Sequence, residues 1–370
     1  MRLGRPDLRR VSGTPRADRR SSRRRLITAF LATGAALCAT GFPSMVASGG
    51  SAAPEVIQLT IGDTSASPTP TGFLPSLAMP EIPNLYRRVG LDVKTVSIPL
   101  GQAVQLVASG NPPVATGTGP SYVVFGYVHG ATNVRFFAGE MQKPPYELVV
   151  RKGITELNQI KTLGVSTVGS TSSQTCQTLL RSAHMQANRD YDLVLLGTAS
   201  VRIAAVQAGK VDGTCEPVPY PEYYHDTYGM TVLAKTSDHL PYYATGGWIY
   251  NARWAQDPVH RAGLVRLTEA ILLAIRWTMD PSNKSRVEAL AATAFHVPNR
   301  YAELYYAELV GRQLLTPDGY IPKQAAESNA RDYPNMGLTG PPPQFFQYYD
   351  WSILREAARA LGFSIRQPEY

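Results

Sequence analysis

The pattern of apolar and polar positions repeats one unit twice, roughly a hundred residues apart. Each copy holds an apolar run, a helical run that ends at a glycine, and a second short apolar run. Short apolar runs predict strands, and a glycine after a helical period predicts the end of a helix. Two equivalent strand–helix–strand units predict two α/β lobes with a cleft between them. The two copies occupy residues 91–96, 101–109 and 114–116, and residues 191–196, 200–208 and 211–216.

The same patterns predict the remaining elements. Further strands are expected at residues 56–62, 134–138, 146–151, 163–168, 230–235 and 243–250. Further helices are expected at residues 121–128, 153–161, 174–187, 258–279, 283–294, 299–314 and 351–361. Proline and other turn-forming residues predict mostly irregular structure at residues 72–88, 217–229 and 315–350.

Strands that alternate with helices predict mostly parallel sheets flanked by helices on both faces. One large doubly wound domain is the alternative, but the repeated unit restarts after the strand at 146–151, which favours two lobes. We expect the first lobe to begin with residues 54–144 and the second lobe to span 145–246. Residues 247–370 are assigned to the remainder of the first lobe and the C-terminal helices. The two hinge crossings are expected near residues 139–146 and 242–250.

Residues 1–53 have the composition of an export signal. An arginine-rich stretch precedes a short apolar run at residues 26–39, and Ser51-Ala52-Ala53 offers a small-residue cleavage site. Residues 22–27 (SRRRLI) resemble a twin-arginine signal, with a general secretory signal as the alternative. Leu37 stands where a lipoprotein anchor at Cys38 needs a small residue. We therefore expect a cleaved signal and a periplasmic or other extracytoplasmic location.

The formal net charge of +8 comes from this leader. Residues 1–53 hold ten Arg and no Lys, against Asp7 and Asp18, which leaves 26 basic and 26 acidic residues in 54–370. A balanced chain argues against a nucleic-acid partner. Zinc-helix, nucleophile-elbow and phosphate-loop motifs are missing, and the six His lack the spacing of metal ligands. These observations favour binding over catalysis and predict no cofactor, no metal and no catalytic residues.

Three hydroxyl-rich segments follow predicted strands. Open α/β sheets bind ligands beyond the carboxyl ends of their strands, and helix N-termini there offer free amides. Because Ser and Thr before a helix also serve as caps, capping is the alternative for each segment. The three segments are residues 63–65, 116–121 and 169–173. The second and third segments hold equivalent places, one in each lobe, which favours a ligand site for that pair.

Two further candidates have other chemistry. Glu216 ends the last strand of the second copy, where its carboxylate could accept hydrogen bonds from ligand N–H groups. A structural pair with a neighbouring Arg is the alternative for Glu216. Trp248 offers an aromatic face for stacking. Cys176 and Cys215 remain after signal cleavage, and an oxidising compartment permits a disulfide between them, with two buried free thiols as the alternative.

A series of motifs in order resembles the periplasmic solute-binding proteins of ATP-binding-cassette importers. Among these proteins, the motifs resemble the group that binds nitrate, aliphatic sulfonates, taurine and thiamine-pyrimidine precursors. The resemblance implies a two-lobed type II binding-protein fold that closes on its ligand and delivers it to a membrane permease. Carried over by position, the ligand contacts that the resemblance implies are Thr64, Ser65, Thr118, Ser121, Ser170, Thr171, Ser172 and Glu216. The chain departs from the pattern at Asn111-Pro112-Pro113-Val114 and in its long region after residue 315. The motifs that carry the resemblance lie at residues 59–62, 90–93, 105–110, 148–151, 164–171, 205–213 and 216–217.

The sequence therefore predicts a monomeric binding component of an importer that captures a small organic solute. An exported enzyme on the same scaffold, or a ligand sensor that does not import, is the alternative. The ligand is expected to carry a sulfonate or an aromatic group such as a pyrimidine.

Overall fold

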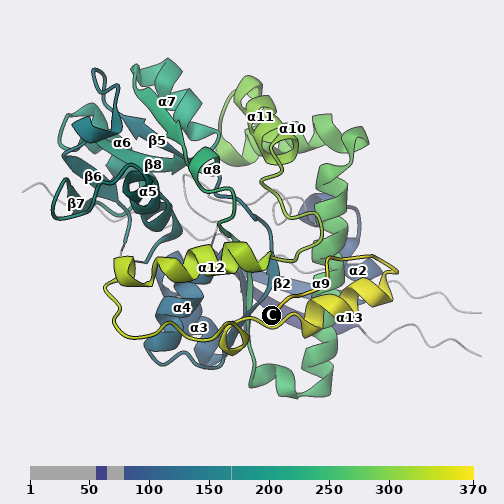
Figure 1. Cartoon of the computed structure of the whole chain (residues 1–370). Helices are drawn as coiled ribbons and strands as arrows, with labels where there is room; N and C mark the ends of the chain where they lie inside the picture. The colour runs from purple at the N-terminus through teal and green to yellow at the C-terminus, as the bar shows by residue number, and fades with distance from the viewer. Residues whose placement is uncertain (1–55, 65–78, 168) are drawn as a thin grey trace, which may run out of the picture. The chain divides into compact units, whose positions relative to one another are not determined.

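The computed structural model describes residues 56–64, 79–167 and 169–370 (Figure 1). All of them belong to one compact unit that begins at Ala52. The predicted export signal, Cys38 and Ser65 lie outside the described residues. In the described part of the chain no helix is both long and apolar enough to cross a membrane.

Two five-stranded mixed sheets organise the described residues. In the first sheet, β1 pairs in parallel with β2 and β3, while β10 is antiparallel to β3 and β4. The inner strands at residues 114–116 and 247–251 are buried throughout, whereas the edge strand at residues 91–97 has one buried residue, Leu91. The strands, in their order across the sheet, are β2 (Leu91–Ser97), β1 (Ile57–Asp63), β3 (Val114–Thr116), β10 (Gly247–Asn251) and β4 (Val134–Gly139).

The second sheet repeats this arrangement. There β6 pairs in parallel with β7 and β8, while β5 is antiparallel to β8 and β9. Its strand β5 is buried along its whole length. The strands, in their order across the sheet, are β7 (Asp192–Leu195), β6 (Thr162–Val165), β8 (Gly213–Pro217), β5 (Tyr146–Val150) and β9 (Thr231–Lys235).

The predicted repeat is confirmed in this topology. Its first copy forms edge strand β2, helix α3 (Ala103–Ser109) and strand β3, and its second copy forms edge strand β7, helix α6 (Ala199–Gln207) and strand β8. Gly110 ends α3 in the left-handed conformation that glycine favours. The two α/β lobes predicted from the repeat are therefore present, one around each sheet.

The chain passes from the first sheet to the second between β4 and β5, through residues 140–145. It returns after β9, through α8 (Thr236–His239) and residues 240–246, to reach β10. These two passages are adjacent, because the Tyr243 amide donates to the Gln142 carbonyl at 3.1 Å and the Thr245 amide donates to the Met141 carbonyl at 3.2 Å.

The first lobe is covered by helices from both ends of the chain. The 22-residue α9 packs against β1 and β2 and against α13, and its buried face runs from Gly263 to Thr278. An Asp257 cap begins α9 by accepting the Val259 and His260 amides. The helices of this lobe are α2 (Leu85–Arg88), α3, α4 (Pro120–Val128), α9 (Pro258–Met279), α12 (Lys323–Arg331) and α13 (Ser352–Ala360).

The second lobe has a hydrophobic core on each side of its sheet. Residues 247–370 were assigned to the first lobe and the C-terminal helices, but α10 and α11 pack in a core with Val149 of β5 and Ile203 of α6. Their apolar faces, led by Phe295 and Tyr305, complete that core. The helices around this sheet are α5 (Thr171–Ser182), α6, α7 (Tyr220–Tyr228), α8, α10 (Lys284–Phe295) and α11 (Asn299–Tyr306), which continues into a π-helical turn, η6 (Ala307–Gly311).

Two predicted local structures are wrong. The helix expected at 153–161 is a single 3-10 turn, η3 (Leu157–Gln159). Residues 217–229, expected to be irregular, contain the helix α7. Its Pro221 lies in the first turn, where a missing amide is tolerated. Tyr220 and Tyr224 stack one turn apart and are buried in the second lobe, so tertiary packing stabilises a helix that composition argues against.

Candidate ligand-binding cleft

A cavity of about 460 Å³ lies where the two lobes meet. Every parallel strand of both sheets ends at it, because the segments that follow β1, β2, β3, β6 and β7 and the last residue of β8 all contribute to its wall. This is where open α/β sheets place ligands. Its lining residues are Thr64, Ile98, Pro99, Leu100, Gly101, Gly117, Gly119, Tyr122, Tyr146, Ser166, Thr167, Thr171, Ser172, Gly197, Thr198, Ala199, Arg202, Pro217 and Gly246.

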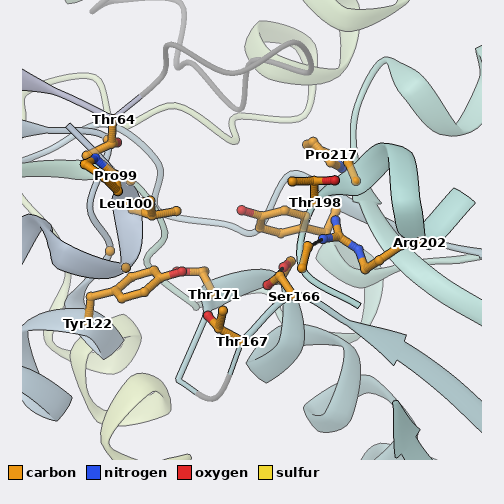
Figure 2. Close-up of a pocket in the computed structure, with 18 of the residues that line it drawn as sticks. Thr64, Pro99, Leu100, Tyr122, Ser166, Thr167, Thr171, Thr198, Arg202 and Pro217 are labelled. Atoms are coloured by element: carbon orange, nitrogen blue, oxygen red, sulfur yellow. Dashed lines mark hydrogen bonds between the residues drawn. The ribbon is translucent and has the colours of Figure 1, made fainter. Parts of the chain in front are cut away.

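The wall from the first lobe combines one hydroxyl with an apolar surface. Thr64 follows β1 and donates from Oγ1 to the Thr116 carbonyl at 3.0 Å. A Cβ on Gly117 would lie 2.2 Å from that Oγ1, and Gly117 has φ of +78°, so only glycine fits there. Pro99 and Leu100 present their side chains beside Thr64 (Figure 2).

The wall from the second lobe is richer in hydroxyls. Ser166 and Thr167 follow β6, and Thr171 and Ser172 form the first turn of α5. The Ser166 hydroxyl donates to Ser170 Oγ at 2.5 Å, and Ser170 in turn caps α5 by accepting the Ser173 amide. The hydroxyls that line this wall can therefore donate to or accept from a ligand oxygen.

The start of α6 supplies the remaining part of this wall. Thr198 is exposed to the cavity, and Arg202 lies one turn further along the helix (Figure 2). The Arg202 Nε donates to Glu216 Oε1 and its Nη2 donates to Glu216 Oε2, each at 3.0 Å. Both side chains are almost fully buried. Burial raises the pKa of Glu216 to about 7, and the guanidinium acts in the opposite direction.

The two lobes touch along α4 and the start of α5. A Cβ on Gly119 would lie 2.7 Å from Thr171 Oγ1, so the backbone of one lobe meets a side chain of the other. The Tyr122 hydroxyl of α4 interacts with the side chains of Thr167 and Ser170. Burial raises the pKa of Tyr122 to about 12, so it is a neutral hydrogen-bonding group at physiological pH.

Three of the predicted contacts, Thr64, Thr171 and Ser172, line the cavity. Ser170 and Glu216 stand directly behind lining residues, bonded to Ser166 and Arg202. The other predicted contacts lie outside the lining. Thr118 and Ser121 are fully buried. Trp248 is buried within the first sheet, where its Nε1 donates to Glu140 Oε1 at 2.7 Å.

Thr198 and Arg202 were not among the predicted contacts, although the sequence held a signal for them. Residues 197–199 (GTA) join the strand and helix of the second repeat, and residues 98–101 do the same in the first repeat. Both connections line the cavity. The repeat therefore pointed to two lining segments, residues 98–101 and 197–199, that a search for hydroxyl-rich segments does not identify.

Cys176 of α5 and Cys215 of β8 form a disulfide, with Cα atoms 5.7 Å apart. Both cysteines lie in the buried core of the second lobe, away from the cavity lining. Among the described residues no group of three or more His, Cys, Asp or Glu could hold a metal ion.

No family model matches the chain. No curated protein matches its sequence either. Solved structures do match. The periplasmic aliphatic sulphonate binding protein SsuA from Escherichia coli is 20% identical, covers 78% of this chain and 91% of its own, and gives a TM-score of 0.60. The periplasmic nitrate-binding protein NrtA from Synechocystis PCC 6803 is 14% identical, with 84% and 90% covered and a TM-score of 0.62.

The chain has the two-lobed type II periplasmic-binding-protein fold. The expected binding-protein fold is thereby confirmed. The same fold occurs in a mutant of DSZB in complex with biphenyl-2-sulfinic acid, which is 16% identical, covers 82% of this chain and 99% of its own, and gives a TM-score of 0.59. Because one fold serves several functions, the residues of the cleft must decide what this chain binds.

Proposed function

We propose that this protein is the extracytoplasmic substrate-binding component of an ATP-binding-cassette importer, and that it captures a small organic solute between its lobes. The observation that carries the proposal is the cavity itself, which joins the carboxyl ends of the parallel strands of both sheets. Its volume of about 460 Å³ suits a small molecule. Proteins with a similar fold include an aliphatic sulphonate binding protein and a nitrate-binding protein.

The lining supports a ligand with a polar head and an apolar body. Hydroxyls of Ser166, Thr171 and Ser172 suit a sulfonate-like or carboxylate-like head, and they also suit the ring nitrogens and oxygens of a pyrimidine. The surface of Pro99 and Leu100 suits an alkyl or aromatic body. Lobe closure on such a ligand would present one closed surface to a membrane permease.

The alternative of an exported enzyme has weaker support. It is kept because fold alone does not decide function, and a DSZB mutant in complex with biphenyl-2-sulfinic acid shares this fold. Yet the described lining holds neither Cys nor His, and Cys176 and Cys215 are engaged with each other in the core. The described wall therefore offers serine and threonine hydroxyls, but neither a thiol nor an imidazole that could activate one of them.

A thermal-shift panel tests the proposal. The purified protein is mixed with nitrate, alkyl and aryl sulfonates, taurine and pyrimidines. A ligand at 100 times its Kd adds about 2.7 kcal/mol to the free energy of unfolding, which raises the Tm by several degrees. Thr198→Trp should abolish the shift, because Thr198 is exposed to the cavity.

Ser200→Trp is the matched control. Ser200 is exposed on the same turn but is not part of the lining, and its hydroxyl shares one 3.0 Å contact with Thr198 Oγ1. Both variants therefore lose the same hydrogen bond and gain the same indole. Loss of the shift in both, or in neither, would contradict binding in this cavity.

A further inference from the structure

The Arg202–Glu216 pair sets the charge of the cavity wall. Arg202 is the one charged side chain among the described lining residues. The undescribed residues 65–78 and 168 contain no Asp, Glu, Lys, Arg or His, so they add no ionisable side chain. Glu216 has no exposed surface, and it lies behind the guanidinium. The positive charge that faces a ligand is therefore offset by a buried carboxylate about 3 Å away.

The guanidinium is also held in one orientation. Its Nε donates to Glu216 and to Thr214 Oγ1 at 3.1 Å, and its Nη1 donates to the Gly197 carbonyl at 2.6 Å. A guanidinium has five N–H groups. The contacts to Glu216, Thr214 and Gly197 engage three of them: the one on Nε, one on Nη1 and one on Nη2. One N–H on each terminal nitrogen remains, on a group directed toward the cavity beside Thr198 (Figure 2).

We infer that Glu216 is a positioning residue that limits the ligand's charge through Arg202. This inference rests on the proposed binding function. The cavity takes a solute whose head offers oxygen acceptors and carries no more than one negative charge, attached to an apolar body. A doubly charged head would lose its hydration and meet a wall with no net charge, so its desolvation would be poorly compensated.

The apolar part of the wall completes this ligand class. Ile98, Pro99 and Leu100 form one side of the cavity, and Ala199 and Pro217 contribute to the other. A body without polar groups removes this surface from water when the lobes close over it. The polar head of the ligand then contacts the two remaining N–H groups of Arg202 and the hydroxyls at the start of α5.

Three probes that share one ring and a tetrahedral head test the inference. They are benzenesulfonamide, which is neutral, benzenesulfonate, which has one negative charge, and phenyl phosphate, which has two at pH 8 because its second pKa is about 6. Calorimetry on the purified protein at pH 8 should show phenyl phosphate binding at least about tenfold more weakly than benzenesulfonate. Tighter binding of phenyl phosphate than of benzenesulfonate would overturn the inference.

Glu216→Gln identifies the residue responsible. It keeps the shape of the side chain and one oxygen acceptor for Arg202 but removes the negative charge. The variant should bind phenyl phosphate at least about tenfold more tightly than the wild type does, whereas its affinity for benzenesulfonamide should change by less than about threefold. A merely structural role for Glu216 predicts equal weakening of all three probes, and that result would overturn the inference.

Arg202→Met combined with Glu216→Gln guards against misfolding, because replacing both members of a buried pair avoids a stranded charge. The double variant should retain the wild-type Tm within a few degrees and lose at least about tenfold in benzenesulfonate affinity. Unchanged affinity would overturn the role of Arg202. If the wild type binds none of the probes, this ligand class is wrong, while the binding function itself is decided separately by the ligand that the protein retains on purification.

Discussion

Tyr243, in the passage that returns the chain to the first sheet, donates a 2.5 Å hydrogen bond to Asp332, which follows α12. Asp332 is fully buried and also accepts from Thr178 Oγ1 at 2.7 Å and from Arg181 at 3.4 Å, both on α5. One carboxylate therefore joins the C-terminal region, an interlobe passage and the second lobe. The long region after residue 315, which departs from the family pattern, contributes this junction.

Asp332→Ala should lower the free energy of unfolding by about 2–4 kcal/mol, because it leaves the buried Tyr243 hydroxyl without its acceptor and also removes the contacts with Thr178 and Arg181. Urea unfolding of the variant and the wild type measures the difference. Asp192→Ala, at an exposed position of β7, is the control and should stay within about 0.5 kcal/mol. A loss below about 0.5 kcal/mol for Asp332→Ala would show that the junction is not structurally important.

Gly119→Ala should weaken ligand binding without unfolding either lobe. The added methyl would approach Thr171 Oγ1 to 2.7 Å and separate the lobes where they touch. We expect an affinity loss of about tenfold for any ligand found by the thermal-shift panel. Gly101→Ala is the matched control, because Gly101 also lines the cavity but has no atom within 4 Å of an added Cβ. Equal effects of both variants would argue against closure at Gly119.

Benzenesulfonate binding should tighten as the pH falls from 8 to 6. Burial raises the pKa of Glu216 to about 7, so protonation in this range removes the carboxylate charge that offsets Arg202, while the sulfonate stays anionic. Tyr146 on β5 and Tyr220 and Tyr224 on α7 also interact with Glu216, and burial raises their pKa values, so they stay neutral. Glu147, opposite Glu216 in the β5–β8 pair, is ion-paired with Lys235, and burial raises its pKa to about 7, so the Glu216→Gln variant is needed to separate the two carboxylates.

We expect Kd to fall about three- to tenfold over this range in the wild type. It should stay nearly constant in Glu216→Gln, which has no proton to gain at this position. Calorimetry at four pH values measures both profiles. A Kd that rises as the pH falls, or an equal slope in the variant, would refute the link to Glu216.

Removing the disulfide should destabilise the second lobe. Cys176 and Cys215 are 39 residues apart, and closing a loop of that length stabilises the folded state by about 4 kcal/mol through the entropy of the unfolded chain. Cys176→Ala with Cys215→Ala should therefore shift the urea midpoint down, and a reducing agent should then have no further effect. An unchanged midpoint would show that the crosslink does not constrain the unfolded chain.

The fold was largely predictable because local signals and global topology agree. The repeat placed β2 and β7 at equivalent edges of their sheets, and periodicity placed α9 at residues 258–279, where the structure has it. The failure at α7 has a physical cause. Proline and tyrosine argue against a helix locally, and only the core formed with α10 and α11 makes Tyr220 and Tyr224 favourable there.

The site was predictable in position but not in its electrostatics. Strand ends located Thr64, Thr171 and Ser172 on the wall. The pairing of Glu216 with Arg202 depends on how α6 packs on β8, which no local pattern encodes. The sequence offered ligand contact and structural pairing as alternatives for Glu216, and the observed pair changes the expected role of that residue.

Native mass spectrometry of the protein as purified tests the central claim most directly. The account predicts that wild-type protein carries an additional mass of one small organic molecule, or acquires it from the panel, with a stoichiometry of one. Thr198→Trp should lack this mass, whereas Ser200→Trp should keep it. A wild-type protein that carries no ligand and takes up none from the panel, or a ligand that persists equally in Thr198→Trp, would contradict solute capture in the cleft between the lobes.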